Sequence, residues 1–130
     1  SKSEFSFIDG LIGEDPNQTA YIPGNYERLK SVNEMRGEYQ ITEEVRVLAT
    51  PGHTTGHQSV VVSDGTKKLV YSGDVAPLRQ NLAGHVAMTG SDRKGAVESM
   101  DKLLKIEDAK WIFSHDRTQL TLSRAYTPKR

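Results

Sequence analysis

The sequence predicts a mixed α/β domain in which helices cover a β-sheet. Short runs rich in β-branched residues are separated by turn-forming residues, and one long segment has the periodicity of a helix. At 130 residues the chain is long enough for one domain, although hydrophobic residues make up only 35% of it. This fraction is low for a compact domain, so we expect a core that is thin or shared.

The strands are expected in the middle of the chain. Residues 39–41 and 45–49 both have strand character, and the second of these segments has one apolar face and one mixed face. Residues 58–62 and 68–71 predict a hairpin. Asp64 and Gly65 lie between them and allow the positive φ that a tight hairpin turn requires.

The N-terminal part has fewer regular features. Residues 1–24 are rich in Gly, Pro, Asp and Asn, which predicts a loop with one short strand at 19–22. Residues 25–33 have apolar side chains at three-residue spacing, which is typical of a short helix.

The longest predicted helix covers residues 91–109. Ser91 or Asp92 can cap its N-terminus, and its apolar stripe consists of Val97, Met100, Leu103 and Leu104. Residues 111–113 (Trp-Ile-Phe) then predict a short buried strand. The order of elements is therefore β, α, several β, α, β.

Composition excludes several classes of function. Lys plus Arg equals Asp plus Glu at 17 each, so no net charge attracts nucleic acid or anionic membranes. The chain has no cysteine, which excludes disulfides and thiolate chemistry and leaves nitrogen and oxygen as the only metal ligands. No apolar run reaches the roughly 20 residues of a membrane helix, and no signal peptide is visible. We expect a cytoplasmic protein that acts on a small molecule.

Three polar residues directly follow apolar segments: His53, Asp74 and His115. Strands that end in these residues can bring them together at one edge of a sheet. Imidazole and carboxylate are ligands for zinc and also suit iron or manganese, and a carboxylate can bridge two cations. Each residue also has an ordinary explanation, because an Asp after Ser-Gly is often a turn residue and a His at a strand end is often a surface residue. Spacing alone leaves both explanations open.

Residues 50–57 (TPGHTTGH) resemble the TPGHTxGH segment of the metallo-β-lactamase superfamily. They are followed, as in that family, by Gln-Ser and an apolar strand. Residues 72–74 (SGD) resemble the family's next motif, and residues 113–116 (FSHD) resemble its last. Residues 15–23 are similar to the strand that follows the family's first metal motif. Several motifs in one order are far more specific than any single one.

The resemblance implies a fold and a mechanism. Residues 1–130 would be the C-terminal portion of an αββα sandwich, with a mixed sheet covered by helices. His53 would bind the first metal, Asp74 would bridge the two metals as the central catalytic residue, and His115 would bind the second. Zinc is the expected cation, with iron or manganese as alternatives. A metal-bound hydroxide would attack an ester, lactone or thioester carbonyl.

Two further histidines do not match a ligand position. We expect His57 to support the metal-binding loop by hydrogen bonding, because metal ligands need such partners. His85 lies downstream of Asp74, where lactonase-like hydrolases often have a substrate-lining loop. It is a candidate substrate contact or an exposed loop residue.

The family's first motif, HxHxDH, is absent, and residues 1–44 contain no histidine. The chain therefore offers one terminal ligand per metal plus the bridge, whereas catalytic zinc usually takes three protein ligands. Either the chain is a truncated piece of a longer enzyme, or it is a diverged, non-catalytic domain. We favour truncation, because the remaining ligands are intact. The chain alone would then be inactive, and it would require the missing N-terminal half or self-association.

Residues 72–115 are most similar to lactonase-like and esterase-type members of the family. Acyl-homoserine lactonases often have a Tyr three residues after the bridging Asp, where this chain has Pro77. Thioester hydrolysis of the glyoxalase II type is the alternative chemistry, although no cluster of basic residues for a glutathione carboxylate is evident.

Overall fold

The computed structural model describes residues 37–88, 91–119 and 125–128. The predicted strand at 19–22 and helix at 25–33 lie outside this part of the chain. All five strands predicted within it are present and form one sheet in sequence order. They are β1 (Tyr39–Gln40), β2 (Val45–Ala49), β3 (Gln58–Ser63), β4 (Lys68–Tyr71) and β5 (Ala109–Ile112).

The direction of the strands determines which loops meet. Strands β1 to β4 pair antiparallel in succession, and β5 pairs parallel with β4, so the sheet is mixed. The parallel pair needs a crossover, which contains the 3-10 turn η1 (Gly73–Val75) and the helices α3 (Arg79–Gly84) and α4 (Arg93–Leu104). Because β2, β4 and β5 run in the same direction, their C-terminal ends lie at the same edge of the sheet.

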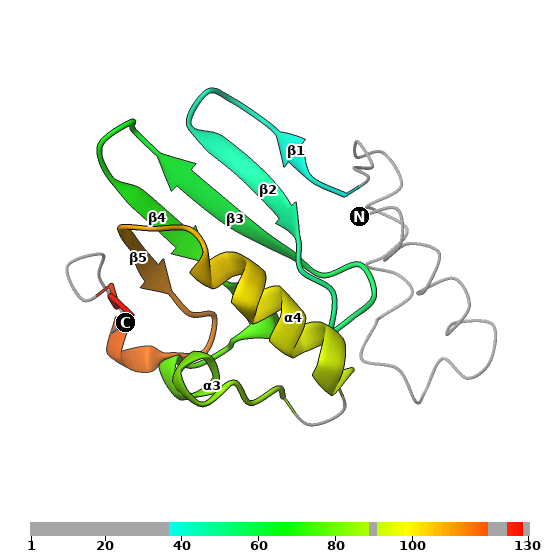
Figure 1. Cartoon of the computed structure of the whole chain (residues 1–130). Helices are drawn as coiled ribbons and strands as arrows, with labels where there is room; N and C mark the ends of the chain where they lie inside the picture. Colours follow the sequence, from blue (N-terminus) through cyan, green and yellow to red (C-terminus); the bar gives the residue numbers. More distant parts are fainter. Residues whose placement is uncertain (1–36, 89–90, 120–124, 129–130) are drawn as a thin grey trace, which may run out of the picture.

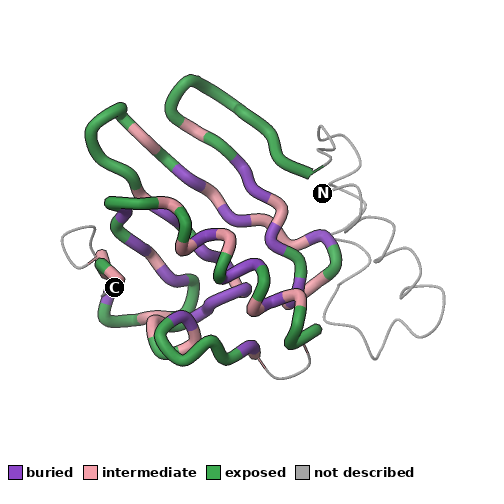
Figure 2. The backbone as a smooth tube through the Cα atoms, viewed as in Figure 1, coloured by how far each residue is buried: buried purple, intermediate pink, exposed green. Residues whose placement is uncertain are grey.

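The core lies between this sheet and α4, which crosses in front of the strands in Figure 1. The register places Val61, Val70 and Trp111 side by side on one face. They pack in one cluster with Met100 and Leu103 of α4, and all five residues are buried. Figure 2 shows buried stretches of backbone both in the strands and in the helix that covers them. Burying a large apolar side chain contributes about 1.5–3 kcal/mol, so this cluster is the main source of stability of the described part.

The opposite face of the sheet is also apolar but less covered. Its central row consists of Val47, Val60, Tyr71 and Ile112. Tyr71 is 42% exposed, and Val62 on the same face is 38% exposed. Leu48 of β2 belongs to the buried cluster, so it lies on the helix-covered face. This is the face of β2 that carries both Arg46 and Leu48 and therefore has a mixed character in the sequence.

One expectation about helices was wrong, and one helix was not expected. The long helix ends at Leu104 with Lys105 as its C-cap, rather than at 109; the chain then turns through Asp108 in a left-handed conformation (φ +56°), and Ala109 already belongs to β5. Helix α3 was not predicted, since Leu82 is its only buried residue and gives no periodic stripe. The N-terminus of α4 was predicted correctly: the Asp92 carboxylate accepts a hydrogen bond from the Gly95 N–H at 3.2 Å. No helix in the described ranges has the length and apolar character required to cross a membrane.

The loop after β2 packs directly against α4. The Gly52 carbonyl accepts a hydrogen bond from the Asp92 N–H at 2.8 Å, and the Ser99 hydroxyl donates to the Pro51 carbonyl at 2.7 Å. Gly52 has φ +144°, and a Cβ added there would lie 2.4 Å from Cα and N of Ala96. The loop approaches the helix this closely only because residue 52 has no side chain.

We therefore expect Gly52→Ala to lower the free energy of unfolding by about 3 kcal/mol, from backbone strain plus a clash that the helix backbone cannot relieve. Gly65→Ala is the matched control, because Gly65 also has positive φ (+87°) but nothing within 4 Å of an added Cβ. It should cost only about 1 kcal/mol. Urea unfolding measures both values, and equal losses would show that the contact with α4 does not matter.

The hairpin turn should depend on pH. The Asp64 carboxylate accepts hydrogen bonds from the Lys67 and Thr66 N–H groups and the Thr66 hydroxyl, which lower the pKa of Asp64 from 3.8 to about 2. The stabilisation is then complete above the unfolded pKa of 3.8 and is lost as the pH falls towards 2. Amide chemical shifts of Thr66 and Lys67 should titrate in this window. Asp64→Asn should abolish the titration, and a midpoint near 4 would contradict the prediction.

Candidate metal centre

Three segments meet at the edge where β2, β4 and β5 end. They are the loop between β2 and β3, the turn η1 after β4 and the residues that follow β5. They carry His53, Asp74 and His115 respectively. The structure thus brings together the three residues that the sequence suggested, although up to 62 positions separate them in the chain.

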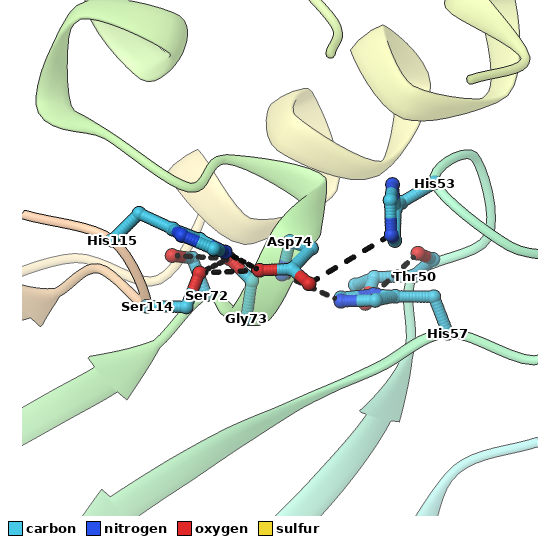
Figure 3. Close-up of polar contacts among 8 residues, drawn as sticks. All are labelled: Thr50, His53, His57, Ser72, Gly73, Asp74, Ser114 and His115. Carbon is cyan, nitrogen blue, oxygen red and sulfur yellow. Dashed lines mark hydrogen bonds and ion pairs between the residues drawn. The ribbon is translucent and has the colours of Figure 1, made fainter. Parts of the chain in front are cut away.

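Asp74 lies between the two histidines. Its Oδ2 is 3.7 Å from Nε2 of His53, and its Oδ1 is 3.1 Å from Nε2 of His115. Figure 3 shows His115 on one side of the carboxylate and His53 on the other. Each carboxylate oxygen therefore faces a different imidazole.

Asp74 is held in its ionised form. Burial raises the pKa of this carboxyl, but the hydrogen bond from Ser114 and the nearby imidazoles of His115 and His53 lower it more, so that its pKa is below the ordinary value. The Ser114 hydroxyl lies 2.5 Å from Oδ1 of Asp74 and 3.1 Å from the Gly73 carbonyl. An ionised carboxylate is the form that can accept a cation at neutral pH.

His57 holds the backbone of Asp74. Its Nε2 accepts a hydrogen bond from the Asp74 N–H at 2.8 Å, so Nε2 carries no proton. Its Nδ1 lies 2.9 Å from the Thr50 carbonyl, which can only accept, so Nδ1 carries the proton and donates. These two contacts define a neutral imidazole of one tautomer, which connects the end of β2 to the turn η1.

A chain of buried hydroxyls continues from this contact. The Ser59 hydroxyl donates to the Ser72 carbonyl at 2.8 Å, so its oxygen is left to accept from the Thr50 hydroxyl, also at 2.8 Å. The side chains of all three residues are fully buried. The chain links the ends of β2, β3 and β4, which fixes the loops that carry His53 and Asp74 relative to each other.

The structure places His85 in a different environment. This residue ends α3 in a left-handed conformation (φ +49°). Its Nε2 lies 3.0 Å from Oδ1 of Asp101 on α4, and both side chains are exposed. None of the contacts around Asp74 described above involves His85.

The donors suit a divalent cation in kind but not in number. Within the described ranges, no three His, Asp or Glu side chains surround a single point as a metal ion would require. Each side of Asp74 instead offers one imidazole and one carboxylate oxygen, which is short of the three protein ligands of a typical catalytic zinc site. Nδ1 of His53 is buried and has no hydrogen-bond partner among the described residues.

Apart from the expectation that His57 supports the metal-binding loop, the sequence did not indicate the supporting contacts. Ser114 lies within the FSHD segment, but its bond to Asp74 joins residues 40 positions apart, which no local pattern indicates. The hydroxyls of Thr50 and Ser59 could have been noticed, because each lies near a strand end where an apolar pattern stops or starts. Their mutual contacts depend on the strand register.

Comparisons with known proteins agree on one family. The family model described as the metallo-beta-lactamase superfamily matches residues 10–115. An N-acyl homoserine lactonase of a Bacillus species is 29% identical over 89 residues, which cover 65% of this chain. The matched region covers only 36% of that relative, so the chain corresponds to about a third of its length.

Solved structures give the same result. A structure of N-acyl homoserine lactone hydrolase with the product N-hexanoyl-L-homoserine at its catalytic metal center is 25% identical, with a TM-score of 0.61 over 71% of this chain and 40% of that one. A dizinc quorum-quenching lactonase, also 25% identical, has a TM-score of 0.58 over 78% of this chain and 37% of that one. The family model, the curated relative and these structures together show that the chain belongs to the metallo-β-lactamase superfamily and is lactonase-like within it.

Proposed function

We propose that His53, Asp74 and His115 are metal ligands of a hydrolase that cleaves a lactone or ester. The observation that carries this proposal is the position of Asp74, whose two carboxylate oxygens face two different imidazoles at 3.7 Å and 3.1 Å. In this assignment His53 serves one cation, His115 serves the other and Asp74 serves both. Zinc is the proposed cation, since a similar solved structure is a dizinc lactonase.

The cations, when bound, would supply an activated water nucleophile and polarise the substrate carbonyl. The residues of this chain perform the supporting tasks. The Ser114 hydroxyl and the two imidazoles keep Asp74 ionised, and His57 holds the Asp74 backbone through its N–H. Preorganised ligands of this kind reduce the cost of binding, because little structure has to change.

The proposed substrate is a lactone, on the basis of the product seen in a similar enzyme. Pro77 occupies the position where acyl-homoserine lactonases often have a Tyr, and here its carbonyl accepts the His115 N–H at 3.0 Å. This position therefore supports the site through the backbone and offers no side-chain hydroxyl to a substrate. Simple lactones and aryl esters are consequently better candidate substrates than acyl-homoserine lactones, and thioesters are the alternative.

The remaining ligands would have to come from another polypeptide segment. No histidine precedes His53 in this chain, and among the described residues each side of Asp74 has one imidazole and one carboxylate oxygen. We propose that residues 1–130 act as the C-terminal portion of a two-part domain. The partner would be a segment with the HxHxDH motif, and the exposed apolar face with Val62 and Tyr71 would be available for contact.

The chain alone should therefore bind zinc weakly. We expect a Kd above about 1 μM, which corresponds to less than about 8 kcal/mol of binding free energy. Isothermal titration calorimetry at neutral pH measures this value, and Asp74→Asn should abolish the residual binding because it removes the shared ligand. A tight site in a single chain would contradict the proposal that further ligands are needed.

Addition of the missing segment should create activity. We expect zinc-dependent hydrolysis of γ-lactones or aryl esters when the chain is mixed with a purified fragment of a relative that carries HxHxDH. Asp74→Asn and His115→Ala should each reduce the rate at least about a hundredfold, since removal of a metal ligand removes the nucleophile and the Lewis acid together. His85→Ala is the control and should have little effect. Equal rates with and without Asp74 would contradict the assignment.

A further inference from the structure

We propose that Arg79 and Asp116 form a positioning pair that sets the place of His115 at the metal centre, an inference that rests on the proposed function. Asp116 directly follows His115 in the chain, and Arg79 is the first residue of α3. The Arg79 Nε donates to Oδ2 of Asp116 at 2.9 Å. The two residues are 37 positions apart in the sequence, so this ion pair joins the segment after β5 to the crossover.

The carboxylate of Asp116 is built into the structure. Its side chain is only 6% exposed, and its second oxygen accepts hydrogen bonds from the Thr118 N–H at 3.0 Å and the Thr118 hydroxyl at 2.6 Å. The Arg79 guanidinium, which also donates to Thr118, holds the pKa of Asp116 below its ordinary value. The Arg79 guanidinium is the cation that faces this carboxylate, so the pair ties the segment after β5 to the start of α3.

A second anchor lies on the other side of His115. Gln119 is buried, and its side chain accepts the Phe113 N–H at 3.0 Å and donates to the Trp111 carbonyl at 2.9 Å. These contacts fold the 3-10 turn η2 (Arg117–Gln119) back onto the end of β5. The loop that carries His115 is therefore closed at its base by Gln119 and attached to α3 at its tip by Asp116.

The same short crossover segment also carries Asp74. His115 donates its N–H to the Pro77 carbonyl at 3.0 Å, and Arg79 binds the neighbouring Asp116. Residues 74–79 thus hold the carboxylate at one end and the His115 backbone at the other. The separation of Asp74 and His115 depends on this segment, and a displacement of Arg79 would change it.

His115 needs such anchors because packing cannot hold it. Its side chain is 60% exposed, and a ring in solvent has few neighbours to restrict its rotation. Besides its contact with Asp74, the backbone position and the neighbouring Arg79–Asp116 ion pair are then the main determinants of where its Nε2 lies. His53, by contrast, is on a loop packed against α4 through Gly52 and does not depend on Arg79.

The test uses the full chain labelled with ¹⁵N and the variants Arg79→Gln and Arg79→Lys. Lys102→Gln is the matched control, because Lys102 is 40% exposed like Arg79, pairs with the Glu38 carboxylate and donates to the Ala49 carbonyl at 3.0 Å, on the His53 side of the site. Without metal, Arg79→Gln should lower amide exchange protection of His115 about tenfold through local opening. Arg79→Lys should lower this protection less than Arg79→Gln does, since lysine keeps the positive charge but lacks the planar guanidinium group with its several N–H donors. Lys102→Gln should leave His115 unchanged.

The second measurement is a zinc titration followed at the ring nitrogens. Arg79→Gln should raise about tenfold the zinc concentration that is needed to shift the ring-nitrogen signals of His115, because the loss of a partner of a metal ligand typically lowers metal affinity by this much. The response of His53 should change much less. If Arg79→Gln lowers thermal stability as much as Lys102→Gln while His115 keeps its protection and its zinc response, the positioning role is wrong. If His115 loses protection but no histidine of the unsubstituted chain responds to zinc, the positioning pair is supported and the proposed metal site is contradicted.

Discussion

The imidazole of His57 is the contact on which the arrangement of the site depends. It binds the Thr50 carbonyl at the end of β2 with one nitrogen and the Asp74 N–H with the other. Because one nitrogen donates and the other accepts, only a neutral ring in one tautomer satisfies both contacts. The buried hydroxyls of Thr50 and Ser59 extend this connection to the end of β4, so three strands share one polar network.

Much of the described fold follows from local sequence patterns. The hairpin of β3 and β4 was predictable because a β-branched run, an Asp-Gly turn and a second apolar run lie next to each other. The end of α4 was not, because Ile106 and Ala109 continue the apolar pattern beyond Leu104 while the backbone turns at Asp108. Helix α3 was missed, since a six-residue helix with one buried side chain leaves no periodic signal.

The candidate site, like the fold, could be predicted from the sequence only in part. His53, Asp74 and His115 were found from their positions after strands and from motifs, and the parallel direction of β2, β4 and β5 explains why they meet. A supporting role was expected for His57, but the contacts of Ser114 with Asp74 and of Arg79 with Asp116 were not predictable, because they join residues about 40 positions apart. Such pairs depend on strand register and on the path of the crossover, neither of which is encoded in a short window of sequence.

The close approach of His57 to Gly73 has a consequence for attempts to alter this protein. Gly73 has φ +60°, and a Cβ added there would lie 2.7 Å from Nε2 of His57, the atom that accepts the Asp74 N–H. A larger residue at position 73 would therefore displace the ring that orients the next residue along the chain. In directed evolution these two positions should be randomised together or kept fixed together, and in an alignment of close relatives they should covary.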